Sequence, residues 1–162
     1  MTIQIRNAKL DDASQMSELL NEIIAIGGTT AFLDPVSPEL MQEWMTKDDG
    51  RATWLVAEDE DGLVVGYQSA EPRERLPADA ASIASFVRVG VVGGGIGSKL
   101  FTQTCNSLRA LGYTWINATI RSDNDSGLRY YTKMGFQDWH IEPDAALTDG
   151  RITGKTHKRF DL

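Results

Sequence analysis

Five glycines lie close together near the middle of the chain, between an apolar stretch and a run with helical spacing. They fall within the segment Val89–Leu100, at positions 90, 93, 94, 95 and 97. Backbone N–H groups in the first turn of a helix have no intrahelical partner and carry a partial positive charge. Because glycine has no Cβ, a phosphate group can approach these N–H groups closely. The pattern predicts a backbone cradle for phosphate or pyrophosphate, although a glycine-rich turn that only joins strand to helix would also fit.

Two common phosphate-binding patterns do not match this segment. The P-loop pattern G-x-x-x-x-G-K-[ST] fails, because no glycine here is followed by Lys and then Ser or Thr at that spacing. The dinucleotide pattern G-x-G-x-x-G also fails, because Ser98 stands where the third glycine would follow Gly93 and Gly95.

The elements that must position the glycines follow from hydrophobic spacing. Alternating or apolar runs predict strands over residues 2–7, 53–58, 63–71, 81–89, 113–120, 136–141 and 151–161. Helical spacing predicts helices after Asp12 and Ser37 and over residues 96–111 and 124–134, and Gln15 should complete a capping box with Asp12. Antiparallel strands followed by a strand–helix–strand unit predict an α+β fold, a mixed sheet with helices on its faces.

Length and charge limit the class of protein. The 162 residues fit a single domain, residues 1–162, and the net charge of −7 disfavours a nucleic-acid partner, which needs a basic face. One cysteine, Cys105, excludes an intramolecular disulfide, and two histidines leave little for a metal site. The N-terminus has no apolar signal region, and no run is long enough for a membrane span. We therefore expect a cytoplasmic protein with no metal, nucleic-acid or membrane partner.

The glycine segment resembles motif A of the GNAT superfamily, the acyl-CoA-dependent N-acyltransferases. That motif, Q/R-x-x-G-x-G/A, falls on Val92–Gly97, with Val92 in place of Gln or Arg. A second motif of the family, N-x-x-A/S-x-x-x-Y-x-x-x-G-F, falls on Asn124, Tyr131 and Gly135-Phe136, with Gly127 in place of Ala or Ser. The two motifs occur in the family's order, and the expected order of strands and helices also matches GNAT proteins along nearly the whole chain.

The resemblance implies a three-layer fold with a mostly antiparallel sheet of about seven strands and about four helices. It implies acetyl-CoA as co-substrate, with Tyr131 as the general acid that protonates the departing thiolate. Tyr131 could instead be a half-buried packing residue, and helical spacing alone does not distinguish it from Tyr130. The residues expected to bind the cofactor are Phe86, Val87, Val92, Gly93, Gly95, Ile96, Gly97, Ser98 and Asn124. Asn124 also suits a helix cap. Many relatives form dimers, so a homodimer is expected from the resemblance.

An amine must lose a proton before it can attack a thioester, and the sequence leaves the base open. Related phosphinothricin-type enzymes often have Glu early in the strand before motif A, at the position that Ser82 occupies in this chain. Glu71, at the end of the preceding strand, could act through water, or could simply be a solvated strand end. His140 has a side chain of a type that titrates near neutral pH, but its strand could be peripheral.

The segment Gly27–Pro38 is similar to the acceptor loop of phosphinothricin- and methionine-sulfoximine-type acetyltransferases. This similarity implies a primary amine of a small amino-acid-like acceptor, with Thr29, Thr30 and Phe32 lining its pocket. Arg73 and Arg75 could attract a carboxylate, or could be solvated charges on a hairpin. Three alternatives stay open: a non-catalytic acyl-CoA binding or sensing domain, a protein or peptide N-acetyltransferase, and an unrelated phosphate- or nucleotide-binding domain.

Overall fold

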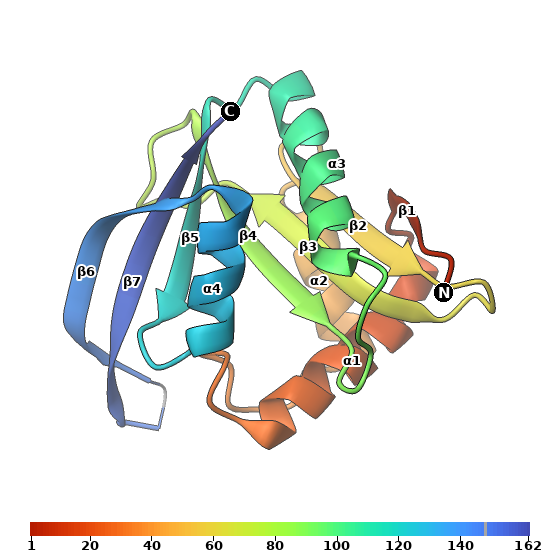
Figure 1. The fold of residues 1–162 in the computed structure, drawn as a ribbon, viewed down its shortest axis with the longest axis horizontal. Coiled ribbons are helices and arrows are strands. Elements are labelled where there is room, and N and C mark those ends of the chain that lie inside the picture. Colours follow the sequence, from red (N-terminus) through yellow and green to blue (C-terminus); the bar gives the residue numbers. More distant parts are fainter. Residues whose placement is uncertain (148) are drawn as a thin grey trace.

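The computed structural model describes residues 1–147 and 149–162 of the chain. Its single sheet has seven strands in the order β1-β2-β3-β4-β5-β7-β6 (Figure 1). The strands are β1 (Gln4–Asn7), β2 (Thr53–Glu58), β3 (Val64–Glu71), β4 (Ala80–Val87), β5 (Trp115–Arg121), β6 (Gln137–Ala146) and β7 (Ile152–Asp161). The helices are α1 (Ala13–Ile26), α2 (Pro38–Lys47), α3 (Ile96–Ala110) and α4 (Asp125–Met134), with a short 3-10 helix, η1 (Leu10–Asp12), before α1. The expected α+β fold with a mixed, mostly antiparallel sheet is confirmed.

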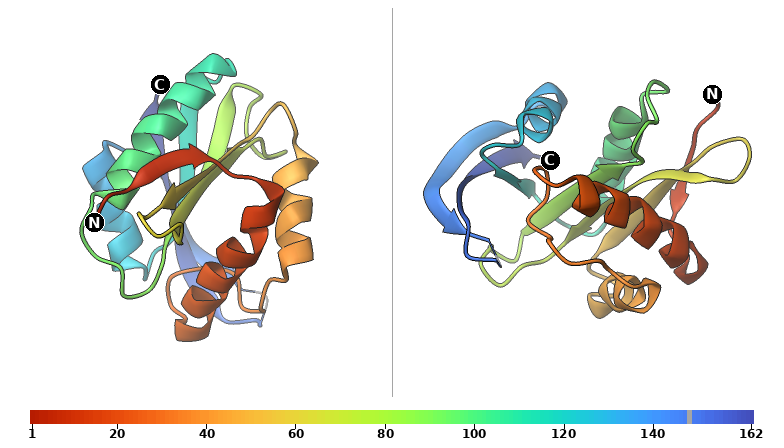
Figure 2. Two further views of the ribbon diagram at one scale, coloured as in Figure 1. Left: turned by 90° about the vertical axis from the view of Figure 1, so that its right-hand side faces the viewer. Right: turned by 90° about the horizontal axis from the view of Figure 1, so that it is seen from below.

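The helices cover the two faces of the sheet in pairs (Figure 2). One face packs against α1 and α2 through a cluster that includes Met16, Leu20, Met41 and Tyr67. Side chains of α3 fill the other face in two clusters, one with β2 and β3 and one with β5 and α4. Within the described residues, no helix combines the length and the apolar character needed to cross a bilayer.

The one parallel pair, β4 and β5, is joined over only part of its length. Backbone partners run from Ala80 with Trp115 to Ile83 with Ala118. Beyond that point β4 continues beside β3 as far as Val87, while β5 continues beside β7 as far as Arg121. Figure 1 shows the two strands diverging toward their carboxyl ends. The sheet therefore opens between these strands, next to the segments where α3 and α4 begin.

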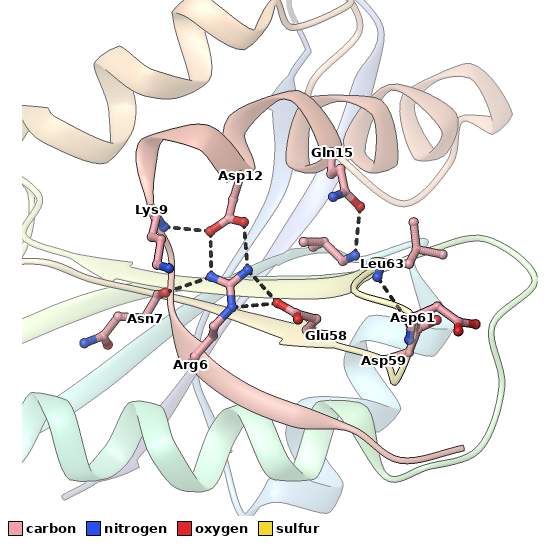
Figure 3. A network of polar contacts seen from close by, with 10 residues as sticks. Arg6, Asn7, Lys9, Asp12, Gln15, Glu58, Asp59, Asp61 and Leu63 are labelled. Atoms are coloured by element: carbon pink, nitrogen blue, oxygen red, sulfur yellow. Dashed lines mark hydrogen bonds and ion pairs between the residues drawn. The ribbon is translucent and has the colours of Figure 1, made fainter.

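An ion-pair network attaches the edge strand β1 to the start of α1 (Figure 3). The Arg6 guanidinium donates to both carboxylate oxygens of Asp12, at 2.8 and 2.9 Å, and to Glu58 on β2 at 2.7 Å. Asp12 also accepts a hydrogen bond from the backbone N–H of Lys9. Gln15 instead accepts from the backbone N–H of Val64. The expected capping box between Asp12 and Gln15 is therefore wrong, because long-range partners occupy both side chains.

Candidate functional site

The glycine segment forms an open loop that ends in the first turn of α3. Gly93, Gly94 and Gly95 have φ angles of 83°, 71° and 60°, a region that other residues rarely adopt. A Cβ added at Gly93 or Gly95 would meet nothing within 4 Å, so this side of the loop is open. The first helical hydrogen bond comes from the N–H of Lys99 to the carbonyl of Gly95. The preceding N–H groups, those of Ile96–Ser98, are therefore not used by the helix.

The side chains of this cradle (Gly93–Ser98) divide between core and solvent. Ile96 is buried among the residues between α3 and the sheet, so only its backbone can reach a ligand. Val92, just before the cradle, is 86% exposed and belongs to none of the core clusters. Its replacement of the usual Gln or Arg consequently leaves the backbone N–H groups of the cradle in place.

Gly97 has a different reason for being glycine. A Cβ at this position would lie 2.6 Å from the ring of Tyr130, which is too close for any real contact. The hydroxyl of Tyr130 donates to the carbonyl of Gly97 at 2.8 Å and accepts from the side-chain amide of Gln68 at 3.0 Å. Tyr130 therefore holds the start of α3 against α4, a role that the sequence did not reveal.

Tyr131 occupies a separate position in the opening of the sheet. Its hydroxyl lies 2.8 Å from Oγ of Ser85 on β4, and its side chain is buried. Burial raises the pKa of Tyr131 well above the usual range of a phenol. Gln68, which binds Tyr130, also donates to Ser85 at 2.8 Å. The structure thus distinguishes the two adjacent tyrosines, which the helical spacing could not.

Phe86 and Val87 lie on the part of β4 that has lost its β5 partner. The ring of Phe86 packs on Tyr67, with ring centroids 5.1 Å apart, and belongs to the cluster under α1. Val87 is partly exposed at the end of the strand. On this edge of β4 the backbone has no strand partner, so it is available to a ligand.

The predicted acceptor loop between α1 and α2 is attached to the far side of the opening. Arg121 donates to the carbonyl of Thr30 at 3.1 Å, and the side-chain amide of Asn124 donates to the carbonyl of Thr29 at 3.0 Å. Asn124 also caps α4, because its side-chain oxygen accepts from the N–H of Gly127 at 3.0 Å. A Cβ at Gly127 would lie 2.4 Å from that side chain, which explains why glycine replaces the usual Ala or Ser.

Glu71 lies at the end of β3, opposite Ser82 of β4. Its carboxylate forms an ion pair of 2.8 Å with Arg73, while its second oxygen is buried without a hydrogen-bond partner. One oxygen of Asp48 is likewise buried without a hydrogen-bond partner. Burial raises the pKa of Glu71, and the Arg73 charge only partly opposes this effect.

A chain of polar side chains lines the β5–β7–β6 side of the opening; we call it the polar wall. In order of contact it consists of Trp139, Asn117, Thr119, His157 and Glu142, joined by hydrogen bonds of 2.9, 3.0, 3.0 and 2.6 Å. A histidine on the final strand is most simply interpreted from sequence as a surface residue, but His157 is buried. His140 lies beside it, with ring centroids 5.3 Å apart. The 2.6 Å contact between His157 and Glu142 is a direct hydrogen bond, so no ion fits between these two atoms.

One cavity of about 860 Å³ connects these features. It extends from Val87, Gly97 and the start of α4 to the acceptor loop and the polar wall. Its lining includes the predicted residues Thr29, Thr30, Phe32, Glu71, Phe86, Asn124 and Tyr131. The cavity therefore brings together residues predicted separately for cofactor, catalysis and acceptor.

Comparisons with known proteins agree with this geometry. Residues 16–136 match the acetyltransferase (GNAT) family. The protein YwnH of Bacillus subtilis (strain 168) is 31% identical over 160 residues, which cover 98% of this chain and 94% of YwnH. The phosphinothricin N-acetyltransferase of Streptomyces coelicolor is 29% identical over 140 residues, 83% of this chain and 82% of that protein.

A solved structure shows the same fold. It is that of a GNAT superfamily phosphinothricin acetyltransferase from Sinorhizobium meliloti in complex with acetyl-CoA. It superposes with a TM-score of 0.88 at 24% identity, over 100% of this chain and 89% of that chain. The chain therefore belongs to the acetyltransferase (GNAT) family and is an acetyl-CoA-dependent N-acetyltransferase.

Proposed function

We propose that this enzyme transfers the acetyl group to the primary amine of a small amino-acid-like acceptor, directly and with Tyr131 as general acid. The observation that carries the proposal is the continuous cavity of about 860 Å³ between the cradle and the acceptor loop. A phosphinothricin N-acetyltransferase among the relatives supports an acceptor of this class. Phosphinothricin is an amino acid with one primary amine.

The chain's own groups suit each end of the cofactor. The N–H groups of Ile96, Gly97 and Ser98 would hold its pyrophosphate, because the open glycine loop leaves them accessible. The unpaired backbone edge of β4 at Phe86 and Val87 would hold its pantetheine arm. Bound acetyl-CoA supplies the activated acetyl thioester. Asn124 stays a predicted contact, in addition to its role as helix cap.

Tyr131 suits the role of a proton donor. Because burial raises the pKa of its hydroxyl, the proton stays on the oxygen at neutral pH, where the hydroxyl can donate to the departing sulfur. Ser85 fixes the hydroxyl in the opening between β4 and β5. A thiolate that leaves in this opening would meet the donor at its oxygen.

Two arginines support an acceptor with a carboxylate. Arg73 and Arg75 both line the cavity at the acceptor end, where a guanidinium can bind a carboxylate in a bidentate manner. Glu71 holds Arg73 in an ion pair. Glu71 also stays a candidate for the proton acceptor, through its second oxygen.

The proposal is tested by two measurements on the purified protein. Calorimetric titration with acetyl-CoA should give micromolar affinity, about −8 kcal/mol at a dissociation constant of 1 μM. ATP and NAD, as comparators, should bind far more weakly. Thiol release should then be followed with phosphinothricin, methionine sulfoximine and a lysine-containing peptide. Turnover with the peptide alone would favour a peptide acetyltransferase instead, and binding without any turnover would favour a sensing domain. Homodimerisation and a cytoplasmic location stay predictions.

A further inference from the structure

The polar wall has a fixed direction of hydrogen bonding. The indole N–H of Trp139 can only donate, so Oδ1 of Asn117 accepts from it at 2.9 Å. The amide nitrogen of Asn117 then faces Thr119, and it can only donate to Oγ1, at 3.0 Å. Oγ1 of Thr119 lies 3.0 Å from Nδ1 of His157, a contact in which either group can donate. The Glu142 carboxylate can only accept, and it lies 2.6 Å from Nε2 of His157. A neutral imidazole therefore carries its proton on Nε2, and Thr119 then donates to Nδ1.

The last contact of the wall stabilises a positive charge on the imidazole. Nε2 of His157 lies 2.6 Å from a carboxylate oxygen of Glu142. The imidazole holds the pKa of Glu142 below its usual range, mainly through this hydrogen bond, so the carboxylate is charged at neutral pH. A proton that reaches Nδ1 of His157 would produce an imidazolium whose second N–H already faces an anion. A hydroxyl, an imidazole and a carboxylate in series form the arrangement in which the imidazole takes the proton of the hydroxyl.

The location of Thr119 suits proton transfer from the acceptor. Thr119 is the first residue of β5 beyond the last position paired with β4, and it is the one exposed residue of that strand. Its side chain faces the cavity that also contains the acceptor loop. Asn117 and His157, in contrast, are buried. Of these three residues, Thr119 is therefore the most accessible to a bound amine.

The wall and Tyr131 lie on opposite faces of the sheet. Alternate residues of β5, Ala118 and Ile120, point into the cluster under α3 and α4, so Thr119 points to the other face. Ser85, on β4, contacts Tyr131 of α4 on the α3–α4 face. A thioester in the opening would thus have a proton donor on one side and a hydroxyl relay on the side of the acceptor loop.

We propose that Thr119, His157 and Glu142 form a proton relay that accepts the proton of the attacking ammonium group; this inference rests on the proposed function. The ammonium proton passes to Oγ1 of Thr119 while the Thr119 proton passes to Nδ1 of His157, which restores the hydroxyl. The amine nitrogen then forms a bond to the carbonyl carbon, and the carbon–sulfur bond breaks. The departing sulfur takes the proton of the Tyr131 hydroxyl. The second proton of the amine nitrogen, which is lost as the amide forms, then returns to the Tyr131 oxygen. The imidazolium of His157 releases its extra proton to solvent.

Thr119 is the group that touches the acceptor, and His157 and Glu142 act through it. Glu71 is the alternative candidate for the proton acceptor, but one of its oxygens already binds Arg73. The ionisable side chains that line the cavity around His157 are His140 and Glu142 of β6, Lys155 of β7 and Arg121 of β5. A pH profile must therefore be compared between variants rather than read from the wild type alone.

The first test measures kcat and KM of acetyl transfer to phosphinothricin between pH 5.5 and 9. Removing the hydroxyl with Thr119→Val should lower kcat about 100-fold, within the usual range for loss of a proton-transfer group, whereas Thr119→Ser should stay within about threefold. The wild-type kcat should fall toward the acid end of this range, and His157→Gln should abolish this dependence. Glu71→Gln should retain it.

The opposite pattern would overturn the relay. If His157→Gln keeps the wild-type profile and Glu71→Gln loses it, Glu71 is the base. Thr119→Val with unchanged kcat would also overturn the relay. Thermal unfolding of each variant identifies any that fail to fold, and Thr119→Ser then still tests the hydroxyl.

A second measurement needs neither cofactor nor acceptor. Long-range ¹H–¹⁵N spectra of the wild type at pH 8 should show the Nε2–H tautomer of His157, with a shift of the Nδ1 resonance in Thr119→Val. An Nδ1–H tautomer would overturn the relay even if the enzyme is active. A protein with the expected tautomer that acetylates no tested amine would instead refute the proposed function and leave the relay supported.

Discussion

The two ends of the cavity are built in different ways. At the end that we propose for the cofactor, the cradle consists of backbone N–H groups from a few consecutive residues, Gly93–Ser98, and its shape follows from positive φ angles. At the acceptor end, the polar wall consists of side chains from three strands, and its contacts join residues as far apart as Thr119 and His157. A local backbone motif can therefore be recognised in one sequence, whereas a wall assembled from distant side chains cannot.

The difference also extends to tolerance of substitution. Val92 replaces a motif residue at the cofactor end, but its side chain is exposed and the N–H groups are unaffected. In the polar wall every member has a specific partner, so the loss of one leaves another unsatisfied. We expect the cradle to depend on backbone conformation and access, and the acceptor end to depend on the identity of single side chains.

The largest expected effect is on the cradle. Gly95→Asp should abolish acetyl-CoA binding, with an affinity loss of more than about 100-fold, because a carboxylate would face the anionic cofactor and a non-glycine residue would need φ of 60°. Calorimetric titration with acetyl-CoA measures this loss of affinity. Gly50→Asp is the matched control, since Gly50 has φ of 79° and open space around it, away from the cavity. Retained binding in Gly95→Asp would contradict the cradle.

The next effect separates the two tyrosines. Tyr131→Phe should lower kcat by about 100-fold while acetyl-CoA affinity changes less than about twofold, because only the proton donor is lost. Tyr130→Phe loses the bond to the Gly97 carbonyl, so it should weaken acetyl-CoA binding with a smaller effect on kcat. Initial rates and calorimetry on both variants measure the split. Equal losses of rate and affinity in Tyr131→Phe would argue against the general acid.

Much of the fold could be predicted from the sequence, and the reasons are local. Residues 53–58 were predicted as a strand and form β2, where an apolar run ends at a tight turn with Gly62 at φ of 81°. Ser37 caps α2 as expected, since its side chain accepts from the N–H of Leu40 at 3.1 Å. The start of α3 at Ile96 follows from the change from glycines to helical spacing.

The errors have a tertiary cause. The sequence predicts a strand over 136–141, but β6 runs to Ala146, because Glu142, Ala145 and Ala146 pair with β7 without apolar alternation of their own. Asp12 binds Arg6 rather than capping α1. In the site, the two motifs predicted the cradle and Tyr131, but no spacing rule links Trp139, Asn117 and His157. The signal available was the polar alternation of Asn117, Thr119 and Arg121 along a buried strand.

The role of Asn124 sharpens the comparison, because this residue lies between the two ends. Asn124→Ser keeps a good helix cap but is too short to retain the bond to the Thr29 carbonyl. If Asn124 mainly positions the acceptor loop, KM for phosphinothricin should rise about tenfold, equivalent to about 1.4 kcal/mol, with acetyl-CoA affinity unchanged. Steady-state kinetics with each substrate varied in turn measures this. A loss of acetyl-CoA affinity would instead assign Asn124 to the cofactor, as the motif predicts.

The smallest effect concerns stability at the acceptor end. Burial raises the pKa of Glu71 in the folded protein, so folding favours its protonated form. Its contribution to stability is therefore present below the ordinary pKa of a glutamate and is lost as the pH rises through the folded value. Glu71→Gln removes a carboxylate that has one buried oxygen without a partner. The variant should be more stable than the wild type at pH 8, by about 1 kcal/mol, with the difference vanishing near pH 4.

Urea unfolding at both pH values measures this difference, and Glu74→Gln, in the neighbouring loop, is the matched control. Glu71→Gln should at the same time weaken binding of the acceptor carboxylate, because Arg73 loses the partner that holds it. A gain in stability together with a loss of acceptor affinity would show that the acceptor end, unlike the cradle, retains a destabilising buried charge for the sake of binding. The contrary result is that Glu71→Gln loses stability relative to the wild type when the pH is raised from 4 to 8. The ion pair with Arg73 would then stabilise the wild type by more than the burial of Glu71 destabilises it.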